Sequence, residues 1–370
     1  MMPWNWWDLV HPAPNNETMR IAQVAPLHES VPPKAYGGTE RVVSYLTEEL
    51  VRRGHRVTLF ASGDSVTRAE LAAICPKALR LNGSLDPLAH HVAQIEQVMR
   101  RRGDFDVIHW HTDYLHYPFS RLAGLSQLTT LHGRLDIPDL APLYRLFPDM
   151  PLVSISQAQR APLPWVRWMA TVHHGLPRDL YTPRRRQGRY LAFLGRLSPE
   201  KRVERAIALA RRAGMPIRIA AKIDEENKEY FEARVKPLLE QDHVEYVGEI
   251  GEAAKDGFLG QALALLFPIE WPEPFGLVMV ESLACGTPVI AFRRGSVPEV
   301  IEDGVTGFIV ETMEEALGAL GRVRLLDRGR CRLAFEERFC VERMAGDYLA
   351  LYERLAARGR GAAVAAAAGP

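Results

Sequence analysis

The sequence lacks the marks of several large protein classes. Its 370 residues include only four cysteines, none in a CxxC pair, which argues against a zinc site and is typical of reduced cytoplasmic thiols. No hydrophobic run approaches the length of a membrane-spanning helix. The N-terminus has neither the basic region nor the apolar core of a signal peptide. We therefore expect a cytoplasmic protein that binds no metal.

The charges are balanced. A formal net charge of +1 argues against a nucleic-acid-binding protein, and 47% hydrophobic residues are typical of a globular one. Arginines cluster at 52–53, 100–102 and 184–186. We interpret these clusters as solvated helix ends or linker, and contact with an anionic membrane surface is the alternative. The sequence leaves the oligomeric state open.

Two nucleotide-binding signatures are also missing. Neither GxGxxG nor GxxxxGK[ST] occurs, which disfavours a dehydrogenase and a P-loop NTPase. Strand and helix patterns instead alternate along the chain, an order typical of parallel sheets with helices on both faces. The expected strands are 20–25, 56–61, 106–110, 128–131, 152–155, 171–173, 190–194, 217–221, 244–247, 264–267 and 288–292. The expected helices are 38–53, 88–101, 200–213, 228–240, 252–263, 330–338 and 341–357.

The alternation is interrupted by a segment with two prolines and four arginines between residues 177 and 188. We predict an interdomain linker there, with a doubly wound α/β domain on each side. Two such domains would enclose a cleft, which is a preferred ligand site. The predicted organisation is an extension at 1–18, a first domain at 19–176, the linker at 177–189, a second domain at 190–340, a helix at 341–357 that crosses back to the first domain, and a disordered Ala/Gly-rich tail at 358–370.

The most informative segment, 271–289, contains two glutamates with seven residues between them, Glu273 and Glu281. Glu273 falls in a loop after an apolar strand, where parallel sheets bind ligands. Glu281 falls within the following helix, which begins after Gly276. A helix start of this kind offers free backbone N–H groups to an anion. An elongated, hydroxyl-rich ligand would therefore contact both acids.

Two further segments at strand ends predict phosphate contacts. Gly37 and Gly38 would let the backbone approach a phosphate closely, although a tight turn is the better explanation when these two glycines are taken alone. Gly195 and Arg196 are followed by Lys201 at the start of an expected helix. Two cations and a helix N-terminus at one point are suited to a diphosphate.

A fourth segment is rich in histidine. We expect His109 to be packed within the sheet, whereas His111, Asp113 and His132 fall just beyond strand ends. A metal site would need a third or fourth well-placed ligand, so we disfavour it. Hydrolysis by the two glutamates is the rival idea. Glycosidase acids must flank one bond, however, and an acid within a helix beside phosphate donors suits binding better.

These segments resemble the retaining nucleotide-sugar glycosyltransferases of family 4, which have the GT-B fold. The resemblance extends from about residue 20 to residue 355 in the family order. It is carried by 37–38, 107–111, 130–133, 154–156, 174–176, 195–196 with Lys201, Glu273 with Glu281, 284–289, 295–299 and 304–308.

The resemblance implies a donor site for a UDP- or GDP-sugar and no essential metal or cofactor. Arg196 and Lys201 would bind the diphosphate, Glu273 the hexose hydroxyls and Glu281 the ribose diol, while His132 would orient the sugar. The remaining donor-binding residues would be Gly37, Gly38, Gly195, Gly248, Ile250, Phe275, Gly276 and Leu277. His111, Asp113 and Arg134 would lie on the side of the acceptor, which would be a glycan, a lipid or a small molecule with a hydroxyl group.

The sequence departs from the family pattern at two places. Arg202 replaces a glycine that many relatives have, and Ala221 with Lys222 stands where a glycine is common. We expect both to make the phosphate edge bulkier and more cationic. A GT-B-fold protein that binds nucleotide sugars without turnover is the alternative function. A related epimerase or phosphorylase is disfavoured because no lysine for a phosphorylase cofactor is evident.

Overall fold

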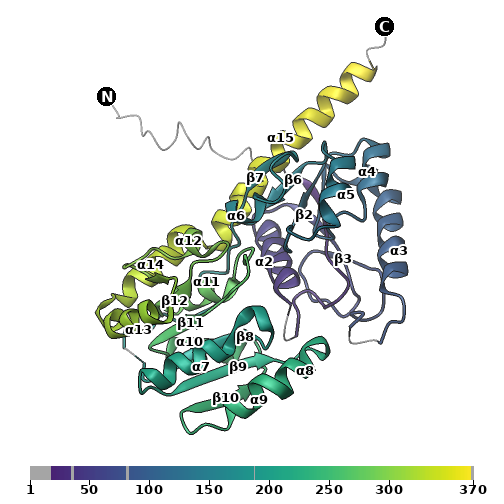
Figure 1. The fold of residues 1–370 in the computed structure, drawn as a ribbon. Coiled ribbons are helices and arrows are strands. Elements are labelled where there is room, and N and C mark those ends of the chain that lie inside the picture. Colours follow the sequence, from purple (N-terminus) through teal and green to yellow (C-terminus); the bar gives the residue numbers. More distant parts are fainter. Residues whose placement is uncertain (1–17, 35–36, 81–82, 187, 368–370) are drawn as a thin grey trace, which may run out of the picture.

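The protein consists of two parallel β-sheets flanked by helices, with the C-terminal helix running back along the first sheet (Figure 1). The structure, a computed structural model, describes residues 18–34, 37–80, 83–186 and 188–367. The predicted extension at 1–18 lies outside the described residues except for Thr18. Two doubly wound sheets confirm the predicted fold class.

The first sheet has seven parallel strands in the order β3-β2-β1-β4-β5-β6-β7. The chain starts in the middle of the sheet, winds to one edge, returns, and winds to the other edge. Its strands are β1 (Arg20–Val24), β2 (Arg56–Ala61), β3 (Glu70–Ala73), β4 (Val107–Trp110), β5 (Gln127–Thr130), β6 (Leu152–Ser154) and β7 (Trp168–Thr171). Its helices are α2 (Gly38–Arg52), α3 (Pro87–Arg100), α4 (Tyr117–Ala123), α5 (Leu140–Leu146) and α6 (Gln157–Arg160).

The second sheet has six parallel strands in the order β10-β9-β8-β11-β12-β13. Its strands are β8 (Leu191–Arg196), β9 (Ile217–Lys222), β10 (Val244–Gly248), β11 (Ala264–Phe267), β12 (Val289–Phe292) and β13 (Gly307–Val310). Its helices are α7 (Val203–Arg212), α8 (Lys228–Tyr230), α9 (Lys236–Leu239), α10 (Glu252–Gly260), α11 (Leu277–Ala284), α12 (Val297–Val300), α13 (Met313–Arg322) and α14 (Arg328–Arg338).

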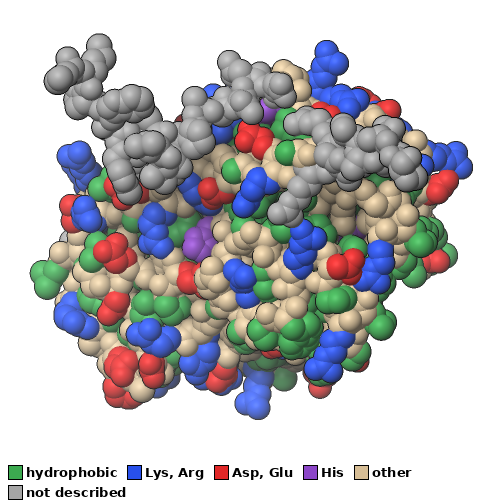
Figure 2. All heavy atoms as spheres, turned by 90° about the horizontal axis from the view of Figure 1, so that it is seen from above, with side chains coloured by type: hydrophobic (Ala, Val, Ile, Leu, Met, Phe, Trp, Pro, Cys, Tyr) green, Lys and Arg blue, Asp and Glu red, His purple; other side chains and the backbone are tan. Residues whose placement is uncertain are grey.

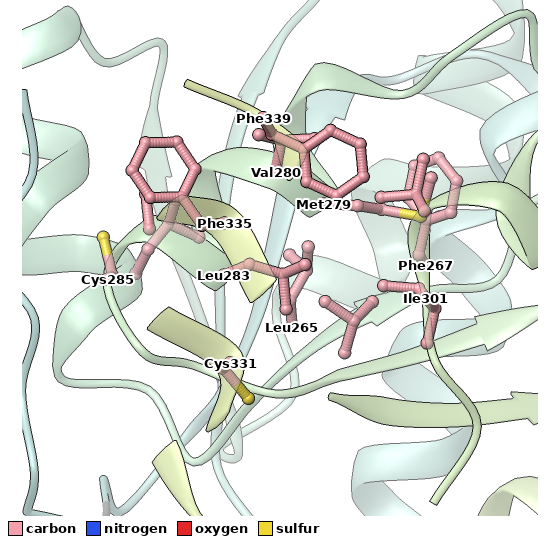
Figure 3. Packing of buried hydrophobic residues seen from close by; sticks show 14 of the residues in the cluster. Leu265, Phe267, Met279, Val280, Leu283, Cys285, Ile301, Cys331, Phe335 and Phe339 are labelled. Carbon is pink, nitrogen blue, oxygen red and sulfur yellow. The ribbon is translucent and has the colours of Figure 1, made fainter. Parts of the chain in front are cut away.

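Helix α11 has apolar residues on nearly all sides, as expected for a helix that is surrounded by other elements of the protein core. Met279, Val280 and Leu283 pack into one core cluster with Leu265 of β11 and Phe335 of α14 (Figure 3). A helix buried this way has a single position relative to the sheet. The packing therefore fixes the site of Glu281, the one acid in α11.

Helix α15 (Val341–Ala367) crosses from the second sheet to the first, as predicted. Met344 and Tyr348 are buried in the cluster that contains Val42 and Leu46 of α2. At the crossing point the Leu176 N–H donates to the Phe339 carbonyl, and the Val341 N–H donates to the Leu176 carbonyl, both at 2.9 Å. The two predicted domain boundaries, at 176 and 340, thus lie side by side.

Three local expectations are wrong. The last strand of the first sheet is β7, upstream of the expected 171–173, because pairing with β6 begins at Trp168. The helix expected at 200–213 begins at Val203, since a 3-10 turn and a left-handed Arg202 precede it. Helix α15 continues to Ala367 and enters the tail predicted to be disordered, where alanine, the strongest helix former, is abundant.

The surface shows no segregation of charge on the face drawn in Figure 2, where Lys and Arg side chains are interspersed with Asp and Glu. Within the described part of the chain, every helix is too short or too polar to cross a lipid bilayer.

Candidate active site

A cavity of about 760 Å³ lies between the two sheets and is lined by residues from both. The two walls meet where a Cβ at Gly38 would lie 3.5 Å from the Leu277 Cδ1. The cavity lies at the carboxyl ends of the strands, as expected for this architecture. Fourteen of the predicted site residues line it: Gly37, Gly38, His111, Asp113, His132, Gly195, Arg196, Lys201, Ile250, Glu273, Phe275, Gly276, Leu277 and Glu281.

The turn that opens α11 requires glycine. Gly276 has a φ of 77°, and a Cβ there would lie 2.8 Å from Met279 Cε and 3.2 Å from Phe267 Cζ. This turn leaves the first N–H groups of α11 without partners inside the helix, beside the cavity. The sequence prediction of an open helix N-terminus next to Glu273 is consistent with this geometry.

Glu273 receives two donors on one carboxylate oxygen. Lys201 Nζ forms an ion pair with Oε2, and Trp271 Nε1 donates to the same oxygen at 2.9 Å. The side chains of Lys201 and Glu273 are only 15% and 11% exposed, so the pair is largely shielded from water. No described residue donates to Oε1, which is the oxygen left for a ligand. Trp271 was not among the predicted site residues.

Arg196 lies in the wall beside Lys201, and carboxylates partly balance it. Its guanidinium lies 3.5 Å from Asp224 and 3.4 Å from Glu200. Lys222, which also lines the cavity, lies 3.1 Å from Asp224. Lys222 thus adds a cation to the cavity wall, whereas its place at a phosphate edge stays a prediction.

The same expectation is wrong for Arg202. Its side chain is not part of the cavity wall, and its guanidinium pairs with Glu204 at 3.0 Å and with Glu270. Its backbone has a φ of 55°, which lies in the left-handed region that favours glycine. The chain therefore keeps a glycine-like turn here, while the arginine side chain points to other partners.

Glu281 is joined to the first sheet through charged side chains. Lys255 Nζ lies 2.6 Å from Glu281 Oε1 and 3.7 Å from Glu252, and Arg41 of α2 forms an ion pair with Glu252. Sequence reasoning missed Lys255 and Arg41, because each lies on an amphipathic helix where a solvated cation is the ordinary interpretation. The only local hint of this charged cluster was the Glu-x-x-Lys spacing of Glu252 and Lys255, which is typical of an ion pair on a helix.

Three histidines form part of the wall from the first sheet. His111 Nδ1 and His132 Nε2 are 2.9 Å apart, and the His132 ring stacks on His174 with 5.3 Å between ring centroids. Burial lowers the pKa of His132 to about 3 and lowers those of His111 and His174 well below the ordinary value, so all three are neutral near pH 7. His109 is fully buried in the sheet, as predicted. Among the described residues, no three His, Cys, Asp or Glu side chains are grouped so that they could hold a metal ion.

Asp113 has an unusual environment. Its φ of 52° is left-handed, a conformation that Asp tolerates better than most residues. It lines the cavity and is exposed to solvent there, while desolvation by the surrounding protein raises the pKa of its carboxyl to about 6. No hydrogen bond to this carboxylate comes from the described residues.

Two predicted site residues do not line the cavity. Arg134 forms a bidentate pair with Asp136 at 2.7 and 2.8 Å, and its guanidinium carbon lies 5.5 Å from the Trp271 ring centroid, at the edge of the site. Gly248 ends β10 with a φ of 76°, and only its neighbours Glu249 and Ile250 contact the cavity.

The chain matches known protein families. Residues 36–173 match Glycosyltransferase Family 4, and residues 182–326 match Glycosyl transferases group 1. The phosphatidyl-myo-inositol mannosyltransferase of Mycobacterium leprae is 26% identical over 348 residues, covering 83% of this chain and 87% of that protein. The D-inositol 3-phosphate glycosyltransferase of Saccharomonospora viridis is 38% identical over 99 residues, covering 25% of this chain and 23% of that protein.

Solved structures share the fold. AviGT4, a glycosyltransferase involved in avilamycin A biosynthesis, superposes with a TM-score of 0.70 at 24% identity, covering 92% of this chain and 98% of AviGT4. Anabaena HepE in complex with UDP and glucose superposes with a TM-score of 0.69 at 18% identity, covering 89% of this chain and 98% of HepE.

The fold and the cleft thus define a two-sheet α/β protein of the GT-B type. The chain belongs to the group 1, family 4 glycosyltransferases.

Proposed function

We propose that this protein transfers a hexose from a nucleoside diphosphate sugar, UDP- or GDP-linked, to a hydroxyl group with retention of the anomeric configuration. One observation carries the proposal: Arg196, Lys201, Glu273, Glu281 and the start of α11 all line one cavity. Such a donor has sugar hydroxyls, a diphosphate and a ribose diol in a row. The cavity offers one matching group for each part: the Glu273 carboxylate for the sugar hydroxyls, the cations and the open N–H groups of α11 for the diphosphate, and the Glu281 carboxylate for the ribose diol.

In the proposed complex, Glu273 accepts hydrogen bonds from the hexose through Oε1, because Lys201 and Trp271 already occupy Oε2. Glu281 binds the ribose diol. The loop of Gly248, Glu249 and Ile250 contacts the base. UDP and UDP-glucose bound to Anabaena HepE, and the mannosyltransferase relatives, support a nucleotide-linked hexose as the donor class.

The chemical step breaks the bond between the anomeric carbon and the β-phosphate oxygen. Negative charge then develops on the departing phosphate, and Arg196, Lys201 and the N–H groups of α11 are placed to stabilise it. The acceptor oxygen forms the new bond on the same face of the sugar. Its proton passes to the leaving phosphate oxygen, so no enzyme nucleophile is needed.

We assign the acceptor to the wall that holds His111 and Asp113, with Arg134 at its edge. The Asp113 carboxylate lies in the cavity without a described partner, so it is available to an acceptor hydroxyl. A glycan, a lipid-linked sugar and a small molecule all present such a hydroxyl.

The test measures nucleoside diphosphate release from a panel of UDP- and GDP-hexoses. Lys201→Ala and Glu273→Gln should each lower kcat/KM at least about a hundredfold, because each removes a contact to charge or hydroxyls in the transition state. Arg202→Ala is the matched control, since the neighbouring cation lies outside the cavity wall. Near wild-type turnover of Lys201→Ala or Glu273→Gln would refute the assigned roles.

The same panel distinguishes this enzyme from the alternative, a GT-B-fold protein that binds nucleotide sugars without turnover. If nucleotide sugars raise the melting temperature while neither transfer nor hydrolysis occurs, the protein binds donors without turning them over.

A further inference from the structure

A chain of hydrogen bonds runs behind the cavity, in the core between the first sheet and α15. Six bonds of 2.7 to 3.0 Å connect its members without a branch. All members except His132 are buried. In order, they are Tyr348, Thr130, His109, Tyr352, Gln23, His111 and His132.

The sheet register explains why these side chains meet. Gln23 of β1 lies directly across from His109 of β4, so both point to the same face of the sheet, toward α15. Thr130 ends the next strand, β5. Tyr348 and Tyr352 are four residues apart on α15 and therefore share one face of that helix. Two elements that are far apart in the sequence thus complete one polar network.

The imidazoles in this network are neutral. Burial lowers the pKa values of His109 and His111 well below the ordinary range and that of His132 to about 3. A neutral imidazole has one N–H donor and one bare nitrogen acceptor. Each histidine must therefore donate on one side and accept on the other, so the direction of one bond determines the direction of the next.

The amide of Gln23 sets that direction, because its two ends are chemically different. Its Nε2 donates to the Tyr352 hydroxyl at 3.0 Å, and its Oε1 accepts from His111 Nε2 at 2.8 Å. His111 Nδ1 is then the bare nitrogen, so His132 Nε2 must donate to it at 2.9 Å.

The other half of the chain follows in the opposite direction. The Tyr352 hydroxyl accepts from Gln23, so its own proton goes to His109 Nδ1 at 2.7 Å. The His109 Nε2–H then donates to Thr130 Oγ1, also at 2.7 Å. Thr130 Oγ1 and the Tyr348 hydroxyl share the last bond of the chain at 2.9 Å, in which either oxygen can donate.

We propose that Gln23 and Tyr352 are positioning residues that act through His111. They hold His132 in the tautomer with its proton on Nε2, so that Nδ1 serves as the acceptor for a substrate hydroxyl. His132 lines the cavity, and its Nδ1 is a buried atom with no partner among the described residues. The step from tautomer to sugar orientation rests on the proposed function, whereas the tautomer itself does not.

The crossover helix is then part of the active site. The Tyr352 hydroxyl comes from α15, yet the histidine that it helps to orient lies at the end of β5. Docking of α15 on the first sheet therefore supplies the acceptor that holds the Gln23 amide in one orientation.

The first experiment needs no substrate. Nitrogen NMR of the full chain, labelled with ¹⁵N-histidine, should show the proton of His132 on Nε2, with the His132→Asn variant identifying its signals. Tyr352→Phe keeps the ring but leaves the Gln23 amide N–H without an acceptor, so His132 should become a mixture of tautomers. A proton on Nδ1 in the wild-type protein, or an unchanged spectrum of Tyr352→Phe, would overturn the proposal.

Tyr348→Phe is the matched control for this experiment. It removes an equally buried hydroxyl from the same helix, but at the far end of the chain, so the His132 tautomer should stay as in the wild type. Gln23→Met removes both ends of the amide and serves as the second variant, with the same mixture of tautomers expected.

The second experiment measures transfer. Tyr352→Phe should lower kcat about tenfold with little change in the donor KM, a range typical of coupled neighbours. When Tyr352→Phe is added to a His132→Ala variant, it should not lower kcat further, because the histidine through which Tyr352 acts on the substrate is already absent. Equal losses in both backgrounds would show that Tyr352 acts on folding and not through His132. Absence of any transfer in the wild-type protein would contradict the proposed function and leave the NMR result intact.

Discussion

Lys255 Nζ lies 2.6 Å from Glu281 Oε1, so the carboxylate proposed to bind ribose is already paired with a cation in the same wall. The two side chains are 13% and 5% exposed. Removing one partner of so buried a pair leaves the other charge uncompensated. Oε2 of Glu281 has no described partner and is the oxygen that a ribose diol would contact.

Lys255→Met should therefore destabilise the protein by about 3 kcal/mol and weaken nucleoside diphosphate binding. Urea unfolding and titration calorimetry with UDP and GDP measure the two effects. Lys228→Met is the matched control, because Lys228 pairs with Glu225 on the exposed surface at 3.3 Å and should contribute almost nothing. Equal stability of the two variants would contradict this prediction.

Gly276→Ala should cost about 2 kcal/mol of stability, because the left-handed φ and the 2.8 Å approach to Met279 both oppose a methyl group. Donor affinity should fall too, since the first turn of α11 would shift. Gly318→Ala, in the open middle of α13, should instead raise stability by up to about 1 kcal/mol. Chemical denaturation of both variants measures these changes, and a stabilising Gly276→Ala would be inconsistent with the turn.

Asp113→Asn should stabilise the protein more at high pH than at low pH. Desolvation by the surrounding cavity raises the folded-state pKa of Asp113 to about 6, above an unfolded value of about 3.9. Because the residue is nevertheless exposed to solvent, the effect on stability should be small. Between these two values the folded state binds more protons, so ionisation costs stability as the pH rises. Asparagine keeps the left-handed backbone and removes this cost. Urea midpoints near pH 4 and pH 8 test the prediction, and a gain that is equal at both would refute it.

Glu299 of α12 joins the second domain to the first. Its carboxylate accepts from the N–H groups of Gln157 and Ala158 at 2.7 and 2.8 Å, and from His173 at 3.1 Å. Burial alone would raise the pKa of Glu299, but these donors lower it below the ordinary value. Its stabilising contribution is therefore present above the unfolded pKa of about 4.3 and is lost as the pH falls through the lower folded value.

Glu299→Gln should accordingly destabilise the protein by about 1 to 2 kcal/mol at pH 7 and by much less near pH 3. Urea unfolding at the two pH values measures the difference. If the variant loses the same stability at both, the ionised carboxylate is not what holds the two domains together.

The sequence predicted most of the fold because buried parallel strands and amphipathic helices leave regular patterns. The strand predicted at 264–267 has the same bounds as β11. Most of the missed elements share a physical cause, because a short or edge element buries too few residues to show a periodic pattern. Helix α13 (Met313–Arg322) is the exception, since it has ten residues and was not predicted. Strand β3 has no fully buried residue, and β13 and the short helices α4 to α6 have few residues to carry a pattern.

The candidate site was predictable in part for a different reason. Gly276, Lys201 and Glu273 lie in the connections that follow strands, and the carboxyl ends of parallel strands meet at one edge. Lys255, Arg41 and Trp271 carried no such signal, because a cation on a helix or an aromatic in a loop usually has a simpler explanation.

The sequence by itself determined the two doubly wound sheets, the crossing of α15 and the placement of glycines and charges at strand ends, because these depend on local period and chain order. Only the tertiary structure decided which partners those side chains have. Lys201 and Trp271 share one oxygen of Glu273, Arg202 points away from the cavity, and Gln23 is linked to Tyr352 across 329 positions of sequence. Such pairings depend on the register of strands and the docking of helices, and no local pattern encodes them.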